Sequence, residues 1–170
     1  LDAVKREARR LGVNRVISGP QKGEVVQMGF IAAGNAYAYL THALSELGLL
    51  GRLPILKLGL VYPVDEQIVG EFAQQCRQLI VVEERRGFVE RQVLSILNTL
   101  KQNGTVNTEL YGKRFPNGLP GSPETRWLNP SVLIEKLVPL IRDHATLPLE
   151  LTNGRLTAEL KRTNATADYR

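Results

Sequence analysis

Leu53-Pro-Ile-Leu-Lys-Leu-Gly-Leu-Val-Tyr-Pro-Val-Asp-Glu66 begins the stretch, residues 53–93, that decides the fold of this chain. Its apolar run over residues 53–60 ends before Tyr62-Pro63, and Asp65 stands where it can cap the helical pattern that follows. A second apolar run over residues 79–82 precedes a second helical pattern. Strand, helix, strand and helix within about 40 residues are typical of a parallel sheet covered by helices. The stretch therefore predicts an α/β fold.

The same alternation continues on both sides of this stretch. Residues 25–33 are almost continuously apolar, which predicts a buried strand, and residues 34–48 carry apolar side chains at helical spacing. Later patterns predict a helix from Phe88 to the Asn103-Gly104 turn, a strand over residues 106–111, and a helix from Pro130 that Pro139 should kink. We therefore predict a three-layer α/β/α sandwich with a mostly parallel sheet.

The composition divides the chain into three parts. Residues 1–24 are predicted to form a linker helix over residues 1–11, which Gly12 ends, and a linker over residues 13–24. Residues 25–145 form the predicted α/β domain, and residues 146–170 are predicted to be a linker or tail toward a missing downstream domain. Because the chain begins at Leu1 and its only methionine is Met28, we interpret it as a piece of a longer polypeptide.

The charge of the chain lies in its flanks. The formal net charge of the 170 residues is +5, to which residues 1–22 contribute +4 and residues 152–170 contribute +2, so the body carries −1. A nucleic-acid-binding domain would carry its basic face on the folded body, with aromatic side chains among the cations. The distribution therefore argues against a nucleic-acid partner. The chain also lacks an apolar run of about 18 residues, so no membrane-spanning helix is expected.

Cys76 is the only cysteine. A single cysteine forms no internal disulfide and cannot by itself hold zinc or an iron–sulfur cluster. We place Cys76 on the apolar side of the helix that follows Asp65, as a buried thiol, with a reactive thiol as the alternative. One free cysteine and no export signal favour a cytoplasmic protein.

The turn Gly34-Asn35-Ala36 joins the predicted strand over residues 25–33 to its helix. Doubly wound sheets bind ligands at such points, because backbone N–H groups and the helix dipole attract anions there. The turn is thus a candidate contact for CoA or another anion, or an interface turn, although it matches neither Gly-x-Gly-x-x-Gly nor a P-loop. The alternative is that its small residues only let helix and strand pack closely.

Charged residues follow or interrupt two other strands. Glu83 and Glu84, with two arginines after them, form either a charged interface patch at the sheet edge or a solvated helix entry. Lys57 interrupts an apolar strand and so needs a strand-end position or a partner such as Glu84; we single it out as an edge charge without an assigned role. His42 and His144 lack further ligands at metal spacing, and we predict neither a catalytic residue nor a metal site.

Three runs resemble one family in their order and spacing: Gly29-Phe-Ile-Ala-Ala-Gly-Asn-Ala-Tyr37, Lys57-Leu-Gly-Leu-Val-Tyr-Pro-Val-Asp-Glu66 and Val81-Val-Glu-Glu84. The family is that of the indolepyruvate:ferredoxin oxidoreductases, which are thiamine-diphosphate-dependent 2-oxoacid oxidoreductases. The resemblance covers about residues 25–142 and is to the family's transketolase-C-terminal-like domain, which lies between its pyrimidine-binding and diphosphate-binding domains. Gly112-Lys113 followed by Leu119-Pro120 is similar to the family's closing segment.

The resemblance implies that the whole enzyme oxidatively decarboxylates an aryl-pyruvate or similar 2-oxoacid, forms an acyl-CoA and passes electrons to ferredoxin. The implied cofactors are thiamine diphosphate, Mg²⁺ and iron–sulfur clusters, with CoA as co-substrate. The chain lacks the Gly-Asp-Gly and Asn-Asn segment and the cysteines that would hold the cofactors, so none is expected here. The implied partners are the two neighbouring domains of the parent polypeptide, ferredoxin for the whole enzyme, and a second copy in a homodimer.

We therefore predict a non-catalytic structural or interface domain of such an oxidoreductase, inactive by itself. Two alternatives stay open. One is a stand-alone nucleotide- or CoA-binding module that uses the Gly34 turn. The other is a purely structural interaction domain, which would leave a sizeable apolar patch exposed.

Overall fold

The computed structural model describes residues 1–21, 23–125, 127–144, 158 and 161–162. A five-stranded sheet forms its centre, in the strand order β1-β3-β2-β4-β5. Strand β1 is antiparallel to β3, and all other neighbouring strands are parallel. In chain order the elements are α1 (Asp2–Leu11), β1 (Arg15–Ile17), β2 (Val26–Ala33), α2 (Gly34–Glu46), β3 (Ile55–Leu58), α3 (Glu66–Ala73), β4 (Cys76–Val82), α4 (Phe88–Gln102), β5 (Glu109–Tyr111), a short 3-10 turn η1 (Pro116–Gly118) and α5 (Pro130–His144).

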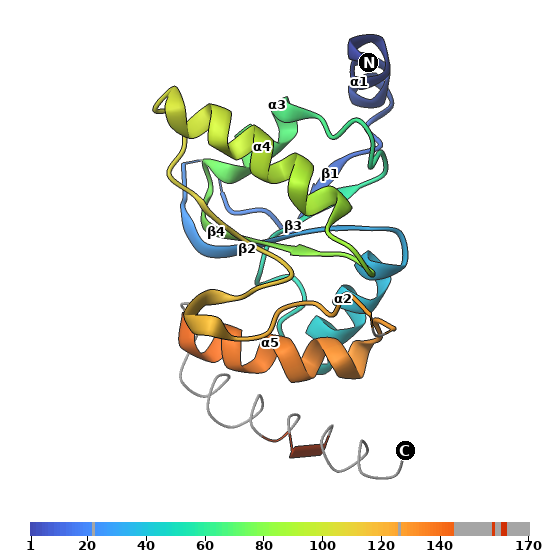
Figure 1. The fold of residues 1–170 in the computed structure, drawn as a ribbon, viewed down its shortest axis with the longest axis vertical. Coiled ribbons are helices and arrows are strands. Elements are labelled where there is room, and N and C mark those ends of the chain that lie inside the picture. Colours follow the sequence, from blue (N-terminus) through green and yellow to red (C-terminus); the bar gives the residue numbers. More distant parts are fainter. Residues whose placement is uncertain (22, 126, 145–157, 159–160, 163–170) are drawn as a thin grey trace.

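Helices cover both faces of the sheet, which confirms the predicted three-layer α/β/α arrangement. Helices α3 and α4 lie on one face, and α2 and α5 on the other (Figure 1). Phe30 of β2 belongs to the core under α2 and α5, whereas its neighbour Ile31 belongs to the core under α3 and α4. Because successive side chains of a strand point to opposite faces, both kinds of position must be apolar. This requirement explains the continuous apolar runs of β2 and β4.

Asp65 begins α3 in the way the sequence predicts. Its Oδ1 accepts a hydrogen bond from the backbone N–H of Gln67 at 3.1 Å, which is the bond of an N-cap residue. Its Oδ2 accepts a second bond, at 2.7 Å, from Nε of Arg9 on α1. The Asp65 side chain is fully buried, so the carboxylate depends on these two donors. It therefore starts one helix and attaches another.

The linker predicted over residues 13–24 contains strand β1, and that part of the prediction was wrong. Val16 of β1 pairs with Leu56 of β3, so the sheet extends beyond the predicted boundary at residue 25. The Asn14 side chain strengthens this attachment, because its Oδ1 accepts hydrogen bonds from the N–H groups of Gly59 and Leu60. A three-residue strand is too short to show a period, so periodicity does not predict it.

Cys76 is buried, as predicted, but it lies on β4 and not on a helix. Helix α3 ends at Ala73, and Cys76 pairs with Val26 of β2. The hydroxyl of Thr108 donates to the carbonyl oxygens of both Ala73 and Cys76, at 2.7 and 2.9 Å, and so closes the turn between helix and strand. The position of Cys76 fits the helical spacing of α3 as well as the inward face of β4, and the pairing with β2 decides between them.

Two predicted strands are shorter in the structure: β3 begins at Ile55 and ends at Leu58, and β5 covers only Glu109–Tyr111. Helix α5 begins at Pro130, as predicted, and continues through Pro139 to His144; the kink expected at Pro139 stays a prediction. The tail predicted over residues 146–170 lies outside the described residues, except for 158 and 161–162. Within the described part of the chain, no helix is long and apolar enough to cross a membrane.

Candidate functional site

The carboxyl edge of the sheet brings together two of the segments that the sequence singled out. Strand β2 ends at Ala33 beside β4, which ends at Val82. A small pocket of about 270 Å³ lies at this edge, and we call it the edge pocket. The turn Gly34-Asn35-Ala36 lines it together with Glu83 and Glu84. The remaining lining residues are Ala33, Val61, Phe88 and Val89.

The Gly34 turn starts helix α2 without a side-chain cap. Gly34 has a φ of 51°, in the left-handed region that favours glycine, and Ala33 at the N-cap position offers no side-chain acceptor. Gly34 and Asn35 are exposed, whereas Ala36 is buried against the core. The first N–H groups of α2 therefore have no capping side chain where they face the edge pocket.

Glu83 fills the corresponding position at the start of helix α4. Its carboxylate accepts hydrogen bonds from the backbone N–H groups of Phe88, Val89 and Glu90, at 2.9, 2.8 and 3.0 Å. The residue is only 9% exposed. A carboxylate at this point also interacts favourably with the helix dipole. The protein's own Glu83 therefore occupies the anion position at α4, while its exposed neighbour Glu84 has no hydrogen bond or ion pair within the described residues.

Lys113 holds the segment that contains Glu83. Its Nζ donates to the carbonyl oxygen of Glu83 at 2.8 Å, and its backbone N–H donates to the carboxylate of Glu90 at 3.0 Å. Burial lowers the pKa of Lys113, and the nearby carboxylates of Glu83, Glu90 and Glu124 act in the opposite direction. A Cβ on Gly112 beside it would lie 2.5 Å from Oε2 of Glu90, so a side chain there would displace the Glu90 carboxylate from its bond to the Lys113 N–H. Packing and hydrogen bonding thus account for the Gly112-Lys113 pair.

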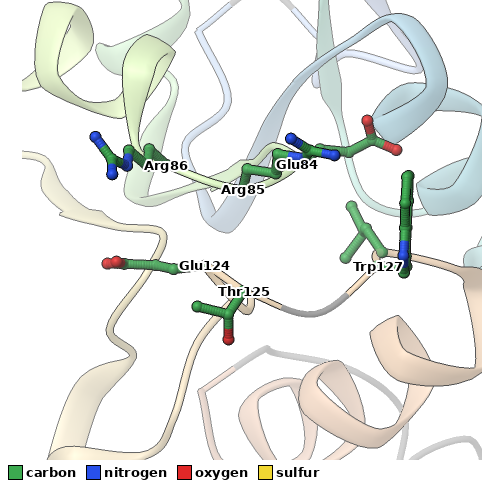
Figure 2. A pocket seen from close by; sticks show the side chains of 7 residues that line it. Glu84, Arg85, Arg86, Glu124, Thr125 and Trp127 are labelled. Carbon is green, nitrogen blue, oxygen red and sulfur yellow. The ribbon is translucent and has the colours of Figure 1, made fainter.

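A larger pocket of about 700 Å³ adjoins the edge pocket and shares Glu84 with it. We call it the arginine–tryptophan pocket, and Figure 2 shows its side chains. The guanidinium carbon of Arg85 lies 5.3 Å from the centre of the Trp127 ring, and 77% of Trp127 is exposed. The sequence placed Arg85 and Arg86 at this edge but gave no role to Trp127, whose only signal was that it is the single tryptophan of the chain. The pocket is lined by Glu84, Arg85, Arg86, Glu124, Thr125, Trp127 and Leu128.

Lys57 does not pair with Glu84. Its Nζ lies 4.6 Å from the centre of the Tyr37 ring, which is a cation–π distance, and no ion pair of Lys57 occurs among the described residues. The side chain is half-buried within β3. The contact with the aromatic face of Tyr37 on α2 therefore explains how the apolar strand accommodates a lysine.

Replacing Lys57 with methionine should change the free energy of unfolding by less than about 1 kcal/mol, because the stem is kept and a partly exposed cation–π contact contributes little. Urea unfolding of the variant measures the change, with Lys101→Met on the exposed side of α4 as the control. A loss above about 2 kcal/mol would mean that Lys57 has a role beyond its contact with Tyr37.

Burial raises the pKa of the Cys76 thiol to about 12. In the unfolded chain the thiol titrates near its usual pKa of about 8.5. The contribution of Cys76 to the free energy of unfolding is therefore full below about pH 8.5. It falls as the pH rises from there toward 12, because in that range only the unfolded chain releases the thiol proton. At pH 8 Ellman's reagent should leave the folded chain unmodified and label one thiol in guanidinium. Rapid labelling of the folded chain would contradict a buried thiol.

Histidine and metal chemistry receive no support from the described residues. His42 is exposed on α2, with Nε2 3.8 Å from a carboxylate oxygen of Glu46. The side chain of His144 lies outside what the structure describes. No group of three His, Cys, Asp or Glu side chains that could hold a metal ion occurs among the described residues.

Comparison with known proteins finds related sequences over most of the chain. The family described as "Indolepyruvate oxidoreductase domain" matches residues 17–155. Indolepyruvate oxidoreductase subunit IorA of Methanothermobacter thermautotrophicus is 37% identical over 100 residues, which is 59% of this chain and 15% of that protein. The subunit of the same name from Archaeoglobus fulgidus is 44% identical over 66 residues, covering 39% of this chain and 10% of its own length.

Among solved structures, the chain is similar to a 2-oxoglutarate:ferredoxin oxidoreductase from Magnetococcus marinus, which was solved with 2-oxoglutarate, coenzyme A and succinyl-CoA bound. The similar region covers 65% of this chain and 18% of the other, with 19% sequence identity and a TM-score of 0.38. The chain spans only 10–17% of the length of the curated relatives it matches. The family match includes β2 to α5 and the end of β1, and leaves α1 outside. The chain belongs to the indolepyruvate oxidoreductase domain family.

Proposed function

We propose that this chain is a non-catalytic structural and interface domain of a larger cytoplasmic enzyme, a 2-oxoacid:ferredoxin oxidoreductase of the indolepyruvate type. The enzyme would oxidatively decarboxylate its 2-oxoacid to an acyl-CoA. Two findings support the proposal: the chain belongs to the family, and the matched region is only 10–17% of the length of its relatives named IorA. The domain would contact the pyrimidine- and diphosphate-binding domains of the parent polypeptide, within a homodimer.

The observation that carries the non-catalytic part is the use of Glu83. At the edge where α/β sheets bind ligands, this carboxylate accepts three backbone N–H groups of its own chain. Lys113, the neighbouring half-buried cation, donates to the carbonyl of the same residue. Side chains used in this way hold the fold together, and they are not free to move protons or to bind a substrate.

The described residues do not fit thiamine diphosphate with its Mg²⁺. Magnesium at a diphosphate needs one or two free carboxylates beside the phosphates, and the buried carboxylate at the ligand edge of this sheet, that of Glu83, already accepts three backbone N–H groups of its own chain. We therefore assign the thiamine diphosphate, the iron–sulfur clusters and the path to ferredoxin to other parts of the enzyme.

Calorimetric titration with thiamine diphosphate and Mg²⁺ tests this assignment. We expect heat of binding for the full polypeptide and none for residues 1–170 alone, with circular dichroism as the control that the shorter chain is folded. Tight binding by the folded shorter chain would contradict the proposal.

A second candidate function is a nucleotide- or CoA-binding role of the edge pocket, favoured by the uncapped start of α2 at Gly34. Glu83 and Glu84 line the same pocket and work against an anionic ligand. Titration of ¹⁵N-labelled chain with CoA distinguishes the two functions. A saturable shift of the Asn35 and Ala36 N–H signals would favour CoA, and unchanged signals would favour the interface role.

A further inference from the structure

Helix α1 carries apolar side chains on a face that the body of the domain leaves largely open. Leu1, Val4, Ala8 and Leu11 lie three or four residues apart, so they share one side of the helix, and we call them the α1 stripe. Ala8 is buried, but Val4 is 46% exposed, Leu11 58% and Leu1 70%. Figure 1 shows α1 at the upper end of the molecule, outside the three layers. The stripe therefore belongs to neither of the two cores.

The side-chain bonds that attach α1 to the body are polar. Nε of Arg9 donates to the carboxylate of Asp65 at 2.7 Å, and Nζ of Lys5 donates to the carboxylate of Glu66. A surface helix normally packs its apolar side against the core and turns its charged side to solvent. In α1 charged side chains bind the body, and three of the four residues of the α1 stripe are exposed. This arrangement indicates that a further element covers the stripe.

A groove of about 480 Å³ lies at the α1 stripe, and we call it the α1 groove. Helix α1 contributes Val4, Ala8 and Leu11 to its lining, and the segment after β3 contributes Leu60. Among the described lining residues only Glu7 is charged, and it pairs with an arginine of its own helix. The groove therefore suits an apolar occupant.

Hydrogen bonds fix the walls of the α1 groove before any partner arrives. Oδ1 of Asn14 accepts from the N–H groups of Gly59 and Leu60, at 2.9 and 3.1 Å. The N–H of Val13 donates to the carbonyl oxygen of Ala8 at 3.2 Å, where the chain leaves α1. A surface that is already ordered loses little conformational freedom on binding, which favours docking.

The spacing and the size of this surface indicate what occupies it. Apolar residues separated by three, four and three positions form a seam into which the side chains of another helix pack. Stable contacts between separate proteins use about 20–30 residues a side, whereas the described lining of the groove has eight. So small a contact suits a partner tethered in the same polypeptide, where its effective concentration is high. The relatives have room for such a partner, since the matched region is only 10–17% of their length.

We propose that the α1 groove docks an amphipathic α-helix of the parent polypeptide that lies outside residues 1–170. Apolar side chains of that helix, three and four residues apart, would pack between Val4 and Leu11 and against Leu60. Helix α1 precedes the family match, which begins at residue 17, so it would join the family domain to another part of the enzyme. The inference rests on the proposed function, because it gives the interface domain one of its contacts.

Photo-cross-linking in the full polypeptide tests the proposal. The variant Leu11→p-benzoylphenylalanine is irradiated, and the linked peptides are mapped by mass spectrometry. We expect a link to a peptide outside residues 1–170 that has apolar residues three and four positions apart. Adding Val4→Glu should lower the yield about ten-fold or more, because a charge would then be buried in an apolar contact. Adding Val4→Leu instead should keep the yield.

Val25→Glu is the matched control, since Val25 is another exposed valine and lies before β2, at the opposite end of the sheet from the α1 groove. It should leave the yield unchanged. Melting of residues 1–170 with Val4→Glu should show the same stability as the parent chain, so that a lower yield does not reflect unfolding.

Three results would overturn the proposal: no link, a link to a peptide without this apolar spacing, or links confined to residues 1–170. A link between the α1 helices of two copies belongs to the last case and would identify a second copy as the occupant. The thiamine diphosphate titration tests the proposed function without using the α1 groove. Failure of the proposed function and failure of the docked helix are therefore distinguishable.

Discussion

Replacing Glu83 with alanine is expected to lower the free energy of unfolding by about 3 kcal/mol, because charge-assisted hydrogen bonds contribute about 1.5–3 kcal/mol each and water replaces only some of them. The carboxylate accepts three N–H groups at the start of α4 and is nearly buried. Without it, the first turn of the helix loses both its acceptor and its favourable charge. Equilibrium urea unfolding measures the loss.

Glu84 provides the matched control for this experiment. It is the next residue in the chain, is exposed, and makes no hydrogen bond within the described residues. Glu84→Ala should therefore change the free energy of unfolding by no more than about 0.5 kcal/mol. Equal effects of the two substitutions would show that the bonds of Glu83 to α4 do not determine the stability of this edge.

Asp65→Ala is expected to cost about 2–3 kcal/mol, which combines the loss of an N-cap with the loss of a charged hydrogen bond. The Asp65 side chain is fully buried between α3 and α1. Asp65→Asn keeps an acceptor for the Gln67 N–H and should cost less. Hydrogen exchange should also show faster opening of α1, because its attachment through Arg9 is gone.

Arg9 and Arg10 on α1 allow an ion pair with a buried carboxylate to be compared with an exposed ion pair. Arg9 pairs with the fully buried Asp65, whereas Arg10 pairs with the exposed Glu7 of its own helix. We expect Arg9→Ala to lower the melting temperature clearly and Arg10→Ala to leave it nearly unchanged.

Lys5 and Glu66 form a second ion pair between α1 and α3. The hydrogen bond from Lys5 lowers the pKa of Glu66 below 4.5. The pair therefore stabilises the folded chain above that pH, and this stabilisation is lost as the pH falls and Glu66 becomes protonated.

The sequence predicted the elements that are long and periodic. Residues 53–93 predict two strands and two helices in the right order, and the position of Asp65 ahead of an apolar helical pattern predicts the cap of α3. Strand β1 was missed because its three residues are held by pairing with β3, a partner some 40 residues away in the chain, as the register of Val16 with Leu56 shows. Cys76 was assigned to the wrong element because one apolar position satisfies both periods.

The candidate site was predictable only in part. The sequence placed the Gly34 turn and Glu83 after two different strands, and the parallel pairing of β2 with β4 brings them to one pocket. The three bonds of Glu83 reach across a turn in which Arg85 has a left-handed backbone conformation, and the composition of the sequence does not predict that conformation. Trp127 comes to the same edge from a Gly- and Pro-rich loop, whose path the periodicity of the chain does not determine.

Strand β1 has a practical consequence for anyone who produces this domain. A truncated chain that begins at residue 25, where the apolar pattern starts, would lack both β1 and the Asn14 side chain that binds Gly59 and Leu60. The outer edge of β3, with Ile55 and Leu56, would then present unpaired N–H and C=O groups beside apolar side chains. Such an edge is a template for pairing with other chains, so the shortened domain would self-associate. Besides attaching the N-terminal segment to β3, residues 1–17 therefore prevent the outer edge of β3 from pairing with other chains.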